Sequence, residues 1–306
     1  MHPFLLNLDG FILPSYGVAM AVGYLVGVLL AARTAQRHGV SFNLVLDLSF
    51  WLLAAGLIGS RLLFVVTNPG SFYRLCAFGE PPTPRGTLAV IYDCTRALHF
   101  WEGGLVFYGA VLGSLAMAAL YSRRHELKLA LVADTAAPSL ALGHALGRLG
   151  CFAAGCCYGK PVAWGVSFPP ESLAHQEMVL GRLLAATAHT TPPLHPTQLY
   201  EAGVELCIFF VLLWINQRKR FAGQTMLVYC MLYPSARMII ELFRADPDRT
   251  YLVELSTPWL NSALGLPAGA PALLSTSQLI SLLVAVVAGW VFWHLRGFCY
   301  SHRTQQ

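Results

Sequence analysis

Residues 129–159 read LALVADTAAPSLALGHALGRLGCFAAGCCYG, an apolar segment that ends in an arginine, three cysteines and several glycines. The part before Gly147 is apolar over roughly 20 residues, the length that a membrane-spanning helix needs. An arginine at a helix centre in a bilayer costs roughly 2.5–3.5 kcal/mol, so Arg148 indicates a functional site. Glycines allow a ligand to approach the backbone closely, and thiols add reactive groups. We therefore expect the function to depend on this stretch.

The whole chain has the composition of a membrane protein. Of its 306 residues 56% are hydrophobic and 11% are charged, whereas soluble domains carry about 25% charged residues. Hydropathy predicts an all-α protein with seven transmembrane helices in a single polytopic membrane domain, residues 1–306, and the fifth helix begins near Gln198. The predicted spans are Tyr16–Ala32, Val45–Val66, Gly104–Tyr121, Leu129–Gly147, Val204–Ile215, Met226–Leu242 and Leu279–Trp293.

Basic residues predict the orientation of the chain. They follow the first, third, fifth and seventh spans, which places these ends in the cytoplasm, the N-terminus outside and the C-terminus inside. Arginines in the second loop weaken this asymmetry without reversing it. Anionic lipid headgroups account for the net charge of +5, and nothing indicates a nucleic-acid partner.

Three longer loops are then external: residues 67–101, 157–196 and 246–276. The second is rich in proline and histidine, and we expect it to form a small periplasmic head. Cys76 and Cys94 in the first can form a disulfide in an oxidising periplasm or remain free thiols, and the sequence leaves both alternatives open.

Polar residues recur at helical spacing inside two spans. His144, Arg148 and Cys151 share one helical face, and His144 is either functional or a buried core histidine. Arg237 and Glu241 either form a salt bridge or bind a charged headgroup.

Other charged residues lie at the ends or packed faces of spans. Arg244 is expected to snorkel or to contact headgroups. Asp47 and Asp134 are expected to cap helices or to pair with arginines, and Gly59-Ser60 favours close helix packing.

Arg61, Arg148 and Arg237 place positive charge in the membrane with few carboxylates to neutralise it. This pattern predicts an anionic ligand, and in a bilayer the simplest such ligand is a phospholipid phosphate.

These motifs, spread over most of the chain, resemble the prolipoprotein diacylglyceryl transferase family. The segments that carry the resemblance are Tyr16-Gly17, Gly59-Ser60-Arg61, Trp101-Glu102-Gly103-Gly104 with Gly109, Gly147-Arg148-Leu149-Gly150, His195-Pro196-Thr197-Gln198-Leu199-Tyr200-Glu201, the Arg237/Glu241/Arg244 motif and Ser275-Thr276-Ser277-Gln278.

The resemblance implies a seven-span enzyme of the bacterial inner membrane. Such an enzyme moves the diacylglyceryl group of phosphatidylglycerol to the lipobox cysteine of a preprolipoprotein signal peptide, and glycerol phosphate leaves. The reaction takes place among membrane lipids, needs no soluble cofactor, and requires a base for the thiol and positive charge on the phosphate.

The resemblance also implies roles for individual residues. Arg148 and Arg237 hold the phosphate, and Glu241 orients Arg237. In this chain we expect His144 or Tyr108 to assist proton transfer in place of the usual family residues. Apart from the resemblance, Gln198 and Glu201 either shape the rim of the cavity or only belong to a helix-start signature, which Pro196 also favours. The expected substrate-binding residues are Tyr16, Arg61, Gly103, Gly104, Cys151, Cys156, Gln198, Tyr200, Glu201, Tyr233 and Arg244.

Three positions depart from the family pattern. Tyr108 stands where the family commonly has histidine, Cys151 where it has asparagine, and Cys156 where it often has glutamate.

These departures leave three interpretations. His144 replaces the base while Tyr108 donates a hydrogen bond; or Cys156 or Cys157 becomes a nucleophile; or catalysis is lost and the protein only binds phospholipid. A metal site is not predicted, because adjacent cysteines are poor tetrahedral partners and no Cys-x-x-Cys is present.

Overall fold

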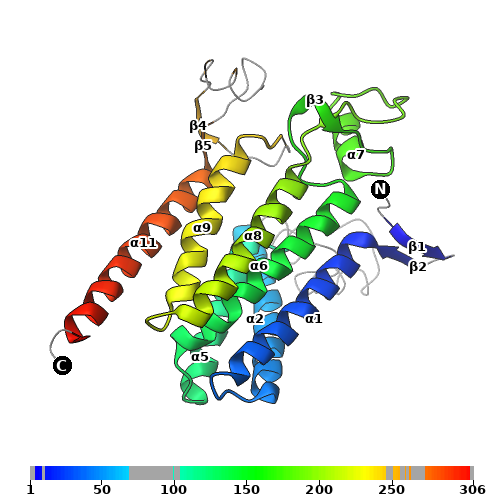
Figure 1. The fold of residues 1–306 in the computed structure, drawn as a ribbon. Coiled ribbons are helices and arrows are strands. Elements are labelled where there is room, and N and C mark those ends of the chain that lie inside the picture. Colours follow the sequence, from blue (N-terminus) through cyan, green and yellow to red (C-terminus); the bar gives the residue numbers. More distant parts are fainter. Residues whose placement is uncertain are drawn as a thin grey trace, which may run out of the picture. The chain divides into compact units, whose positions relative to one another are not determined.

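The computed structural model describes residues 4–8, 11–68, 99, 104–245, 251–255, 259, 262 and 273–303. Each predicted span corresponds to a helix in this part of the chain (Figure 1). Cys76, Cys94 and Gly103 lie outside it, so their expected roles are not described. The helices are α1 (Ser15–Gln36), α2 (Phe42–Thr67), α5 (Phe107–Arg124), α6 (Leu129–Ala154), α8 (Thr197–Arg218), α9 (Gln224–Glu241) and α11 (Thr276–Arg303).

Five of these helices are long and apolar enough to cross a membrane: α1, α2, α6, α8 and α11 up to Arg296. Because their apolar side chains are largely exposed on the isolated chain, a bilayer explains them better than water does. The protein is therefore a helical membrane protein. The prediction that the fifth helix begins near Gln198 is confirmed by the start of α8 at Thr197.

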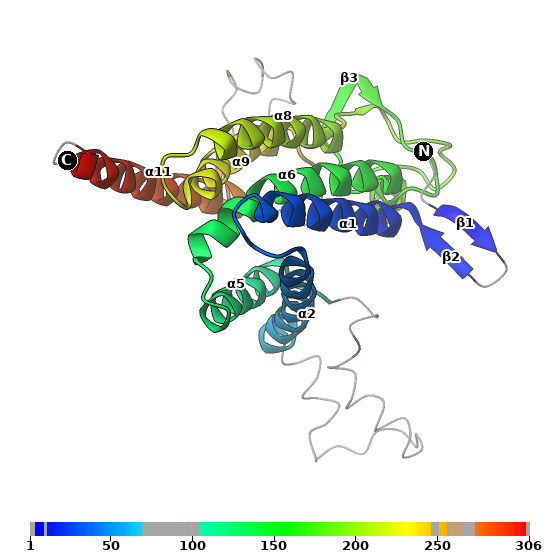
Figure 2. The ribbon, with the colours of Figure 1, turned by 60° about the horizontal axis from the view of Figure 1, so that its bottom comes forward.

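The chain divides into two compact units. The first comprises Met1–Thr34 and Ala133–Gln306, and the second Ala35–Val132. In the first unit α1, α6, α8, α9 and α11 lie side by side in that order, with neighbouring helices antiparallel (Figures 1 and 2). This arrangement brings the C-terminal ends of α6 and α9 to the same end as the N-terminal ends of α8 and α11.

Small residues allow α1 and α6 to pack closely. A side chain on Gly23 would meet the backbone of Gly143, and a side chain on Gly150 would meet Ala19. Gly147 faces α1 as well. Gly147 and Gly150 thus serve close helix packing, and a ligand contact of these motif glycines stays a prediction.

A small folded segment follows α6 in the first unit. It holds β3 (Pro161–Val166) and α7 (Leu173–Leu180). Gly155 makes the turn between α6 and this segment. It has φ +76°, and its carbonyl accepts a hydrogen bond from Ala174 N of α7 at 2.9 Å. The predicted head thus has a core of its own, made of Tyr158, Phe168, Ala174, Met178 and Leu194.

Two short antiparallel hairpins complete the first unit. β1 (Phe4–Leu8) pairs with β2 (Phe11–Pro14), and β4 (Tyr251–Leu255) pairs with β5 (Leu273–Ser275). β2 leads directly into α1, and β5 leads directly into α11.

The second unit is built on the contact between α2 and α5. Gly59 and Gly109 lie back to back with no room for a side chain, which confirms the expected close packing at Gly59-Ser60. Asp47 pairs with a tyrosine rather than an arginine, because Tyr121 Oη donates to its Oδ2 at 2.6 Å.

Asp134 caps a helix, as expected. Its carboxylate accepts hydrogen bonds from the backbone N–H groups of Gly223 and Thr225, both at 2.9 Å, and from Met226 at 3.2 Å. These groups form the N-terminal turn of α9, where a carboxylate is favoured. Lys219 Nζ lies 3.1 Å from the same carboxylate.

Candidate active site

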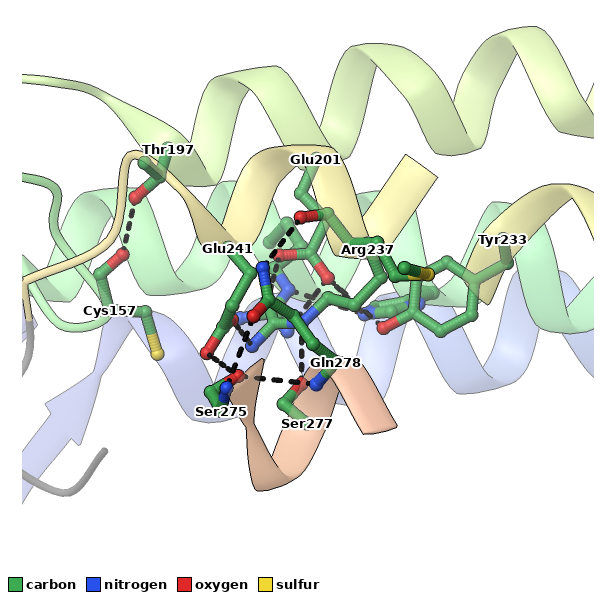
Figure 3. Close-up of polar contacts among 12 residues, drawn as sticks. Cys157, Thr197, Glu201, Tyr233, Arg237, Glu241, Ser275, Ser277 and Gln278 are labelled. Carbon is green, nitrogen blue, oxygen red and sulfur yellow. Dashed lines mark hydrogen bonds and ion pairs between the residues drawn. The ribbon is translucent and has the colours of Figure 1, made fainter. Parts of the chain in front are cut away.

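Glu201 lies at the centre of a buried charged cluster in the first unit (Figure 3). Its side chain is 2% exposed, and it reaches from α8 between an arginine of α6 and an arginine of α9. Glu201 Oε1 is 3.0 Å from an Nη of Arg148, and Oε2 is 3.0 Å from an Nη of Arg237. Tyr233 Oη donates to Oε1 at 3.1 Å. One carboxylate thus holds three helices together.

Arg237 is fixed by a second set of contacts. Its other Nη lies 2.9 Å from Glu241 Oε2, and its Nε donates to Ser277 Oγ at 3.4 Å. Glu241 Oε1 accepts from Ser275 Oγ at 3.2 Å. These contacts show that the first alternative, a salt bridge at i, i+4, is formed, and they support the role of Glu241 in orienting Arg237. Headgroup binding by the same pair stays a prediction.

His144 connects the cluster to a second buried carboxylate. Its Nδ1 lies 2.6 Å from Glu205 Oε1, and its Nε2 accepts a hydrogen bond from Arg148 Nε at 3.2 Å. An arginine cannot accept, so this network assigns the ring proton to Nδ1. Tyr229 Oη also donates to Glu205 at 3.3 Å. The ring of His144 is 26% exposed, while Glu205 is fully buried.

The two buried arginines of the cluster each face a carboxylate. Arg148 and Arg237 face Glu201 and Glu241, and Glu205 faces His144. The expectation that few carboxylates neutralise the arginines is therefore wrong for Arg148 and Arg237, which are paired as buried charges usually are. The contacts described for Arg148 use Nε and one Nη, so further N–H groups remain for an anion.

Gln198 and Arg244 are both buried. Gln198 is 1% exposed, and its Nε2 donates to the carbonyl of Cys156 at 2.6 Å. Neither Gln198 nor Glu201 is exposed at the surface of the first unit. Arg244 is 6% exposed and its backbone pairs with Gly159, so it does not snorkel to the surface. Both residues instead hold the head segment against the ends of the helices.

Tyr200 contacts a buried histidine at the start of α8. His195 Nδ1 lies 3.0 Å from Tyr200 Oη, and the His195 ring packs against Trp164 and Phe243. Burial of the ring, and secondarily the charge of Lys160, lower the pKa of His195 below its ordinary value. The imidazole is therefore neutral at physiological pH.

Three thiols meet at the end of α6. The Sγ atoms of Cys151, Cys156 and Cys157 all lie within 4.8 Å of one another. Hydrogen bonds from the first two thiols, followed by the charges of Arg244 and Arg148, lower the pKa of the Cys157 thiol. Two expected substrate-binding cysteines are thus brought together with a third.

Tyr16 belongs to the same region. It lies near enough to the three thiols and to Arg148 to interact with them electrostatically, and its side chain is 41% exposed. The structure therefore brings Tyr16 and the cysteines to the α6 end of the charged cluster.

The remaining candidates lie in the second unit. Arg61 Nη1 donates to the carbonyl of Gly104 at 3.2 Å, and its guanidinium lies over the Phe64 ring. Gly104 has φ +69°, a conformation that favours glycine. Tyr108 is 50% exposed and contacts the edge of Phe107.

A family model described as prolipoprotein diacylglyceryl transferase matches residues 3–294. The chain belongs to the prolipoprotein diacylglyceryl transferase family. Three relatives that carry the name phosphatidylglycerol–prolipoprotein diacylglyceryl transferase illustrate the similarity. The protein of Clostridium tetani is 27% identical over 95% of this chain and 97% of its own length. Those of Paenarthrobacter aurescens and Thermosynechococcus vestitus are 31% and 30% identical, over 89% and 78% of this chain and 86% and 80% of their own lengths.

In this family member, two residues of the cluster were missed by sequence analysis. Glu205 binds His144, and Tyr229 donates to Glu205. The spacing offered a signal for Glu205, because it follows Glu201 by one helical turn and an acidic residue in an apolar span needs a partner. No comparable signal marks Tyr229, since tyrosines are common in spans.

An apolar groove of about 640 Å³ runs between α8 and α9 of this family member. No charged residue of the cluster lines this groove, because Glu201 and Glu205 are not among the positions of α8 that face it. The groove and the charged cluster are thus separate features. Its lining residues are Leu199, Tyr200, Gly203, Val204, Cys207, Ile208, Val211, Leu232 and Ala236.

Proposed function

We propose that this protein transfers the diacylglyceryl group of phosphatidylglycerol to the lipobox cysteine of a preprolipoprotein. Membership of the family supports the reaction, and the buried cluster supports catalysis by this chain. The observation that carries the proposal is that Arg148, Arg237 and His144 meet around Glu201. Such a cluster can bind a phosphate and deprotonate a thiol, since it combines positive charge with a base.

The proposed setting is the bacterial inner membrane. In this proposal all seven long helices cross the bilayer as one polytopic domain, with the N-terminus outside, the C-terminus inside and the head in the periplasm. The distribution of arginine and lysine supports this orientation. The external segments are then residues 67–101, 157–196 and 246–276.

The proposed role of the two arginines is to bind the phosphate of phosphatidylglycerol. The N–H groups that Arg148 does not use for His144 and Glu201 would bind first. As the phosphate binds the guanidinium of Arg148, the ion pair between Arg148 and Glu201 weakens. Arg61 and Tyr108, in the second unit, stay candidate phospholipid-binding residues on the family resemblance alone.

His144 is the proposed base. Its Nε2 lone pair faces Arg148 Nε in the resting cluster, so the base is free only when Arg148 turns toward a phosphate. Nε2 then takes the proton of the acceptor thiol. The thiolate forms a C–S bond to the glyceryl carbon, the C–O bond to the phosphate breaks, and glycerol phosphate leaves. Glu205 stabilises the resulting imidazolium through Nδ1.

Direct transfer to the acceptor is favoured over a lipidated cysteine of the enzyme. A diacylglyceryl group on Cys156 or Cys157 would be a thioether, and transfer from it would have to expel an alkyl thiolate from carbon. That group leaves far less readily than a phosphate ester. The cysteines therefore have no covalent role in this proposal.

Complementation tests the activity. A strain depleted of its own diacylglyceryl transferase is supplied with the wild type, with Arg148→Ala or with Arg182→Ala, which removes an exposed arginine of the head. We expect rescue and reporter lipoprotein lipidation with the wild type and Arg182→Ala. Arg148→Ala should lower transfer by about 100-fold or more, as loss of a transition-state donor does. A membrane-inserted wild type that lipidates nothing would favour phospholipid binding without catalysis.

Glu205 gives a sharper test of the base. We expect Glu205→Gln to lower kcat by about 10- to 100-fold with little change in the KM for phosphatidylglycerol, because Glu205 acts through His144. In a background of His144→Ala the same change should have little further effect. Glu171→Gln, in the exposed part of the head, is the control. Additive effects of Glu205→Gln and His144→Ala would contradict the proposed pairing.

A further inference from the structure

The three cysteines at the end of α6 converge because of how that helix ends. Gly155 N donates to the carbonyl of Phe152, and Cys156 N donates to that of Cys151 at 3.1 Å. With Gly155 at φ +76°, this is a Schellman ending, in which the residue after the glycine packs on the residue five before it. Here the two packed side chains are thiols, Cys156 and Cys151.

The third thiol is added by an unusual backbone conformation. Cys157 has φ +59°, in the left-handed region that few residues other than glycine adopt. This turn folds Cys157 back, so that its Sγ lies within 4.8 Å of the other two. Adjacent cysteines in regular structure would point apart, which is why the sequence alone argued against a shared site.

The backbone that carries the thiols is held in place from α8. Thr197 Oγ1 donates to the carbonyl of Cys157 at 2.7 Å, as Figure 3 shows. Gln198 Nε2 donates to the carbonyl of Cys156 at 2.6 Å. Gly159 then packs against His195 with no room for a side chain. The three sulfur atoms therefore sit on a rigid support, as the ligands of a metal site do.

The sulfur spacing suits a single cation. With Zn–S bonds of about 2.3 Å, sulfurs bound to one ion lie about 3.8–4.0 Å apart in tetrahedral or trigonal geometry. Small side-chain rotations bring three sulfurs from within 4.8 Å to that separation. Arg148 and Arg244 act electrostatically on Cys157, and their positive charge offsets part of the negative charge of three thiolates.

We propose that Cys151, Cys156 and Cys157 form a binding site for one thiophilic d10 cation, of the class of Zn²⁺ and Cu⁺. Soft thiolate ligands select these ions. The three thiols lose their protons when the ion binds, and the bound ion ties the end of α6 to the head segment. The site is structural, it does not depend on the proposed transferase activity, and its loading stabilises the head.

Cadmium titration tests the site directly. The full-length protein, reduced and metal-free in detergent, is titrated with Cd²⁺, and the sulfur-to-cadmium charge-transfer absorption is followed. We expect saturation at one ion per chain, with competition by Zn²⁺ and Cu⁺. Changing any one of the three cysteines to serine should weaken binding by about tenfold or more. Cys207→Ser, which removes an exposed thiol of α8 outside the proposed site, should leave binding unchanged.

Two further measurements keep the proposal open to refutation. Bound Zn²⁺ should raise the Tm of the wild type but not of Cys156→Ser, and the affinity should increase with pH because binding releases protons. Tight binding that survives in the triple serine variant would overturn the proposal. So would a disulfide between two of the three cysteines in protein purified without reductant, because a redox pair would then replace the metal site.

Discussion

Glu201 is the residue on which the charged cluster depends, because Arg148 and Arg237 both contact its carboxylate. One of its oxygens contacts an arginine of α6 and the other an arginine of α9, and among the described residues Glu201 is the carboxylate that contacts both. The sequence predicts Glu201 among the site residues, at the rim of the cavity. Its central position depends on how α8 is rotated toward α6 and α9, and a motif in one helix does not specify that rotation.

Replacing Glu201 should therefore destabilise the fold as well as the site. We expect Glu201→Gln to lower the free energy of unfolding by about 3–5 kcal/mol, because it leaves buried arginine charge without its partner. Thermal unfolding in detergent measures the change, with Glu171→Gln as an exposed control. An unchanged Tm for Glu201→Gln would mean that the arginines find other partners.

His195 should make stability depend on pH. Its folded pKa lies below the ordinary value of about 6.5 because the ring is buried and Lys160 is near. The unfolded chain then binds the proton more readily, so stability is full above pH of about 6.5 and falls as the pH drops toward the folded pKa. We expect the Tm of the wild type to fall between pH 7.5 and pH 5.

A variant separates this effect from other titrations. His195→Gln should reduce the fall in Tm between pH 7.5 and pH 5, even if it lowers the Tm at both. The matched change His189→Gln, at an exposed position of the head, should leave the pH dependence as in the wild type. Equal pH dependence in wild type and His195→Gln would contradict the assignment.

At the level of helices, most of the structure is predictable from the sequence. All seven predicted spans correspond to helices, because runs of apolar residues mark spans whatever their neighbours are. The pairing between helices is not predictable in this way. For Asp134 the sequence allows a cap or an ion pair, and only the structure shows that it caps α9. For Gly150 the sequence suggests a ligand contact, and the structure adds a packing role against α1 that the sequence does not distinguish, since both roles require glycine.

The contact between α2 and α5 can be tested through its glycines. A side chain on Gly109 would collide with the backbone of Gly59. We therefore expect Gly109→Ala to lower stability by about 1–3 kcal/mol, the usual effect of overpacking. Gly203 of α8 has nothing within 4 Å of a new side chain, so Gly203→Ala should be neutral or stabilising by up to about 1 kcal/mol. Equal effects in thermal unfolding would contradict this difference.

At the scale of the whole molecule, the chain forms two compact units, and the site residues are divided between them. The charged cluster, the thiols and the head belong to the first unit, while Arg61, Gly104 and Tyr108 belong to the second. Nothing in the sequence indicates this division, because both units have the same apolar composition. The head is predictable, because a long loop rich in proline and histidine interrupts the apolar pattern.

Reporter insertions test the proposed orientation of the whole chain. Alkaline phosphatase, which folds only in the periplasm, should be active when inserted after Thr187 in the exposed part of the head. It should be inactive when inserted after Gly39, in the turn between α1 and α2. Green fluorescent protein at the C-terminus should fluoresce. Activity at Gly39 and none at Thr187 would reverse the orientation.

The buried cluster also has a consequence for biosynthesis. A ribosome makes α6, with His144 and Arg148, well before α8, which carries Glu201 and Glu205. At about 5–20 residues per second, the arginine must wait several seconds for its counter-charge. A lone arginine costs roughly 2.5–3.5 kcal/mol in lipid. We therefore expect nascent α6 to remain beside the aqueous translocation channel until α8 arrives, so that the two helices enter the bilayer as a pair.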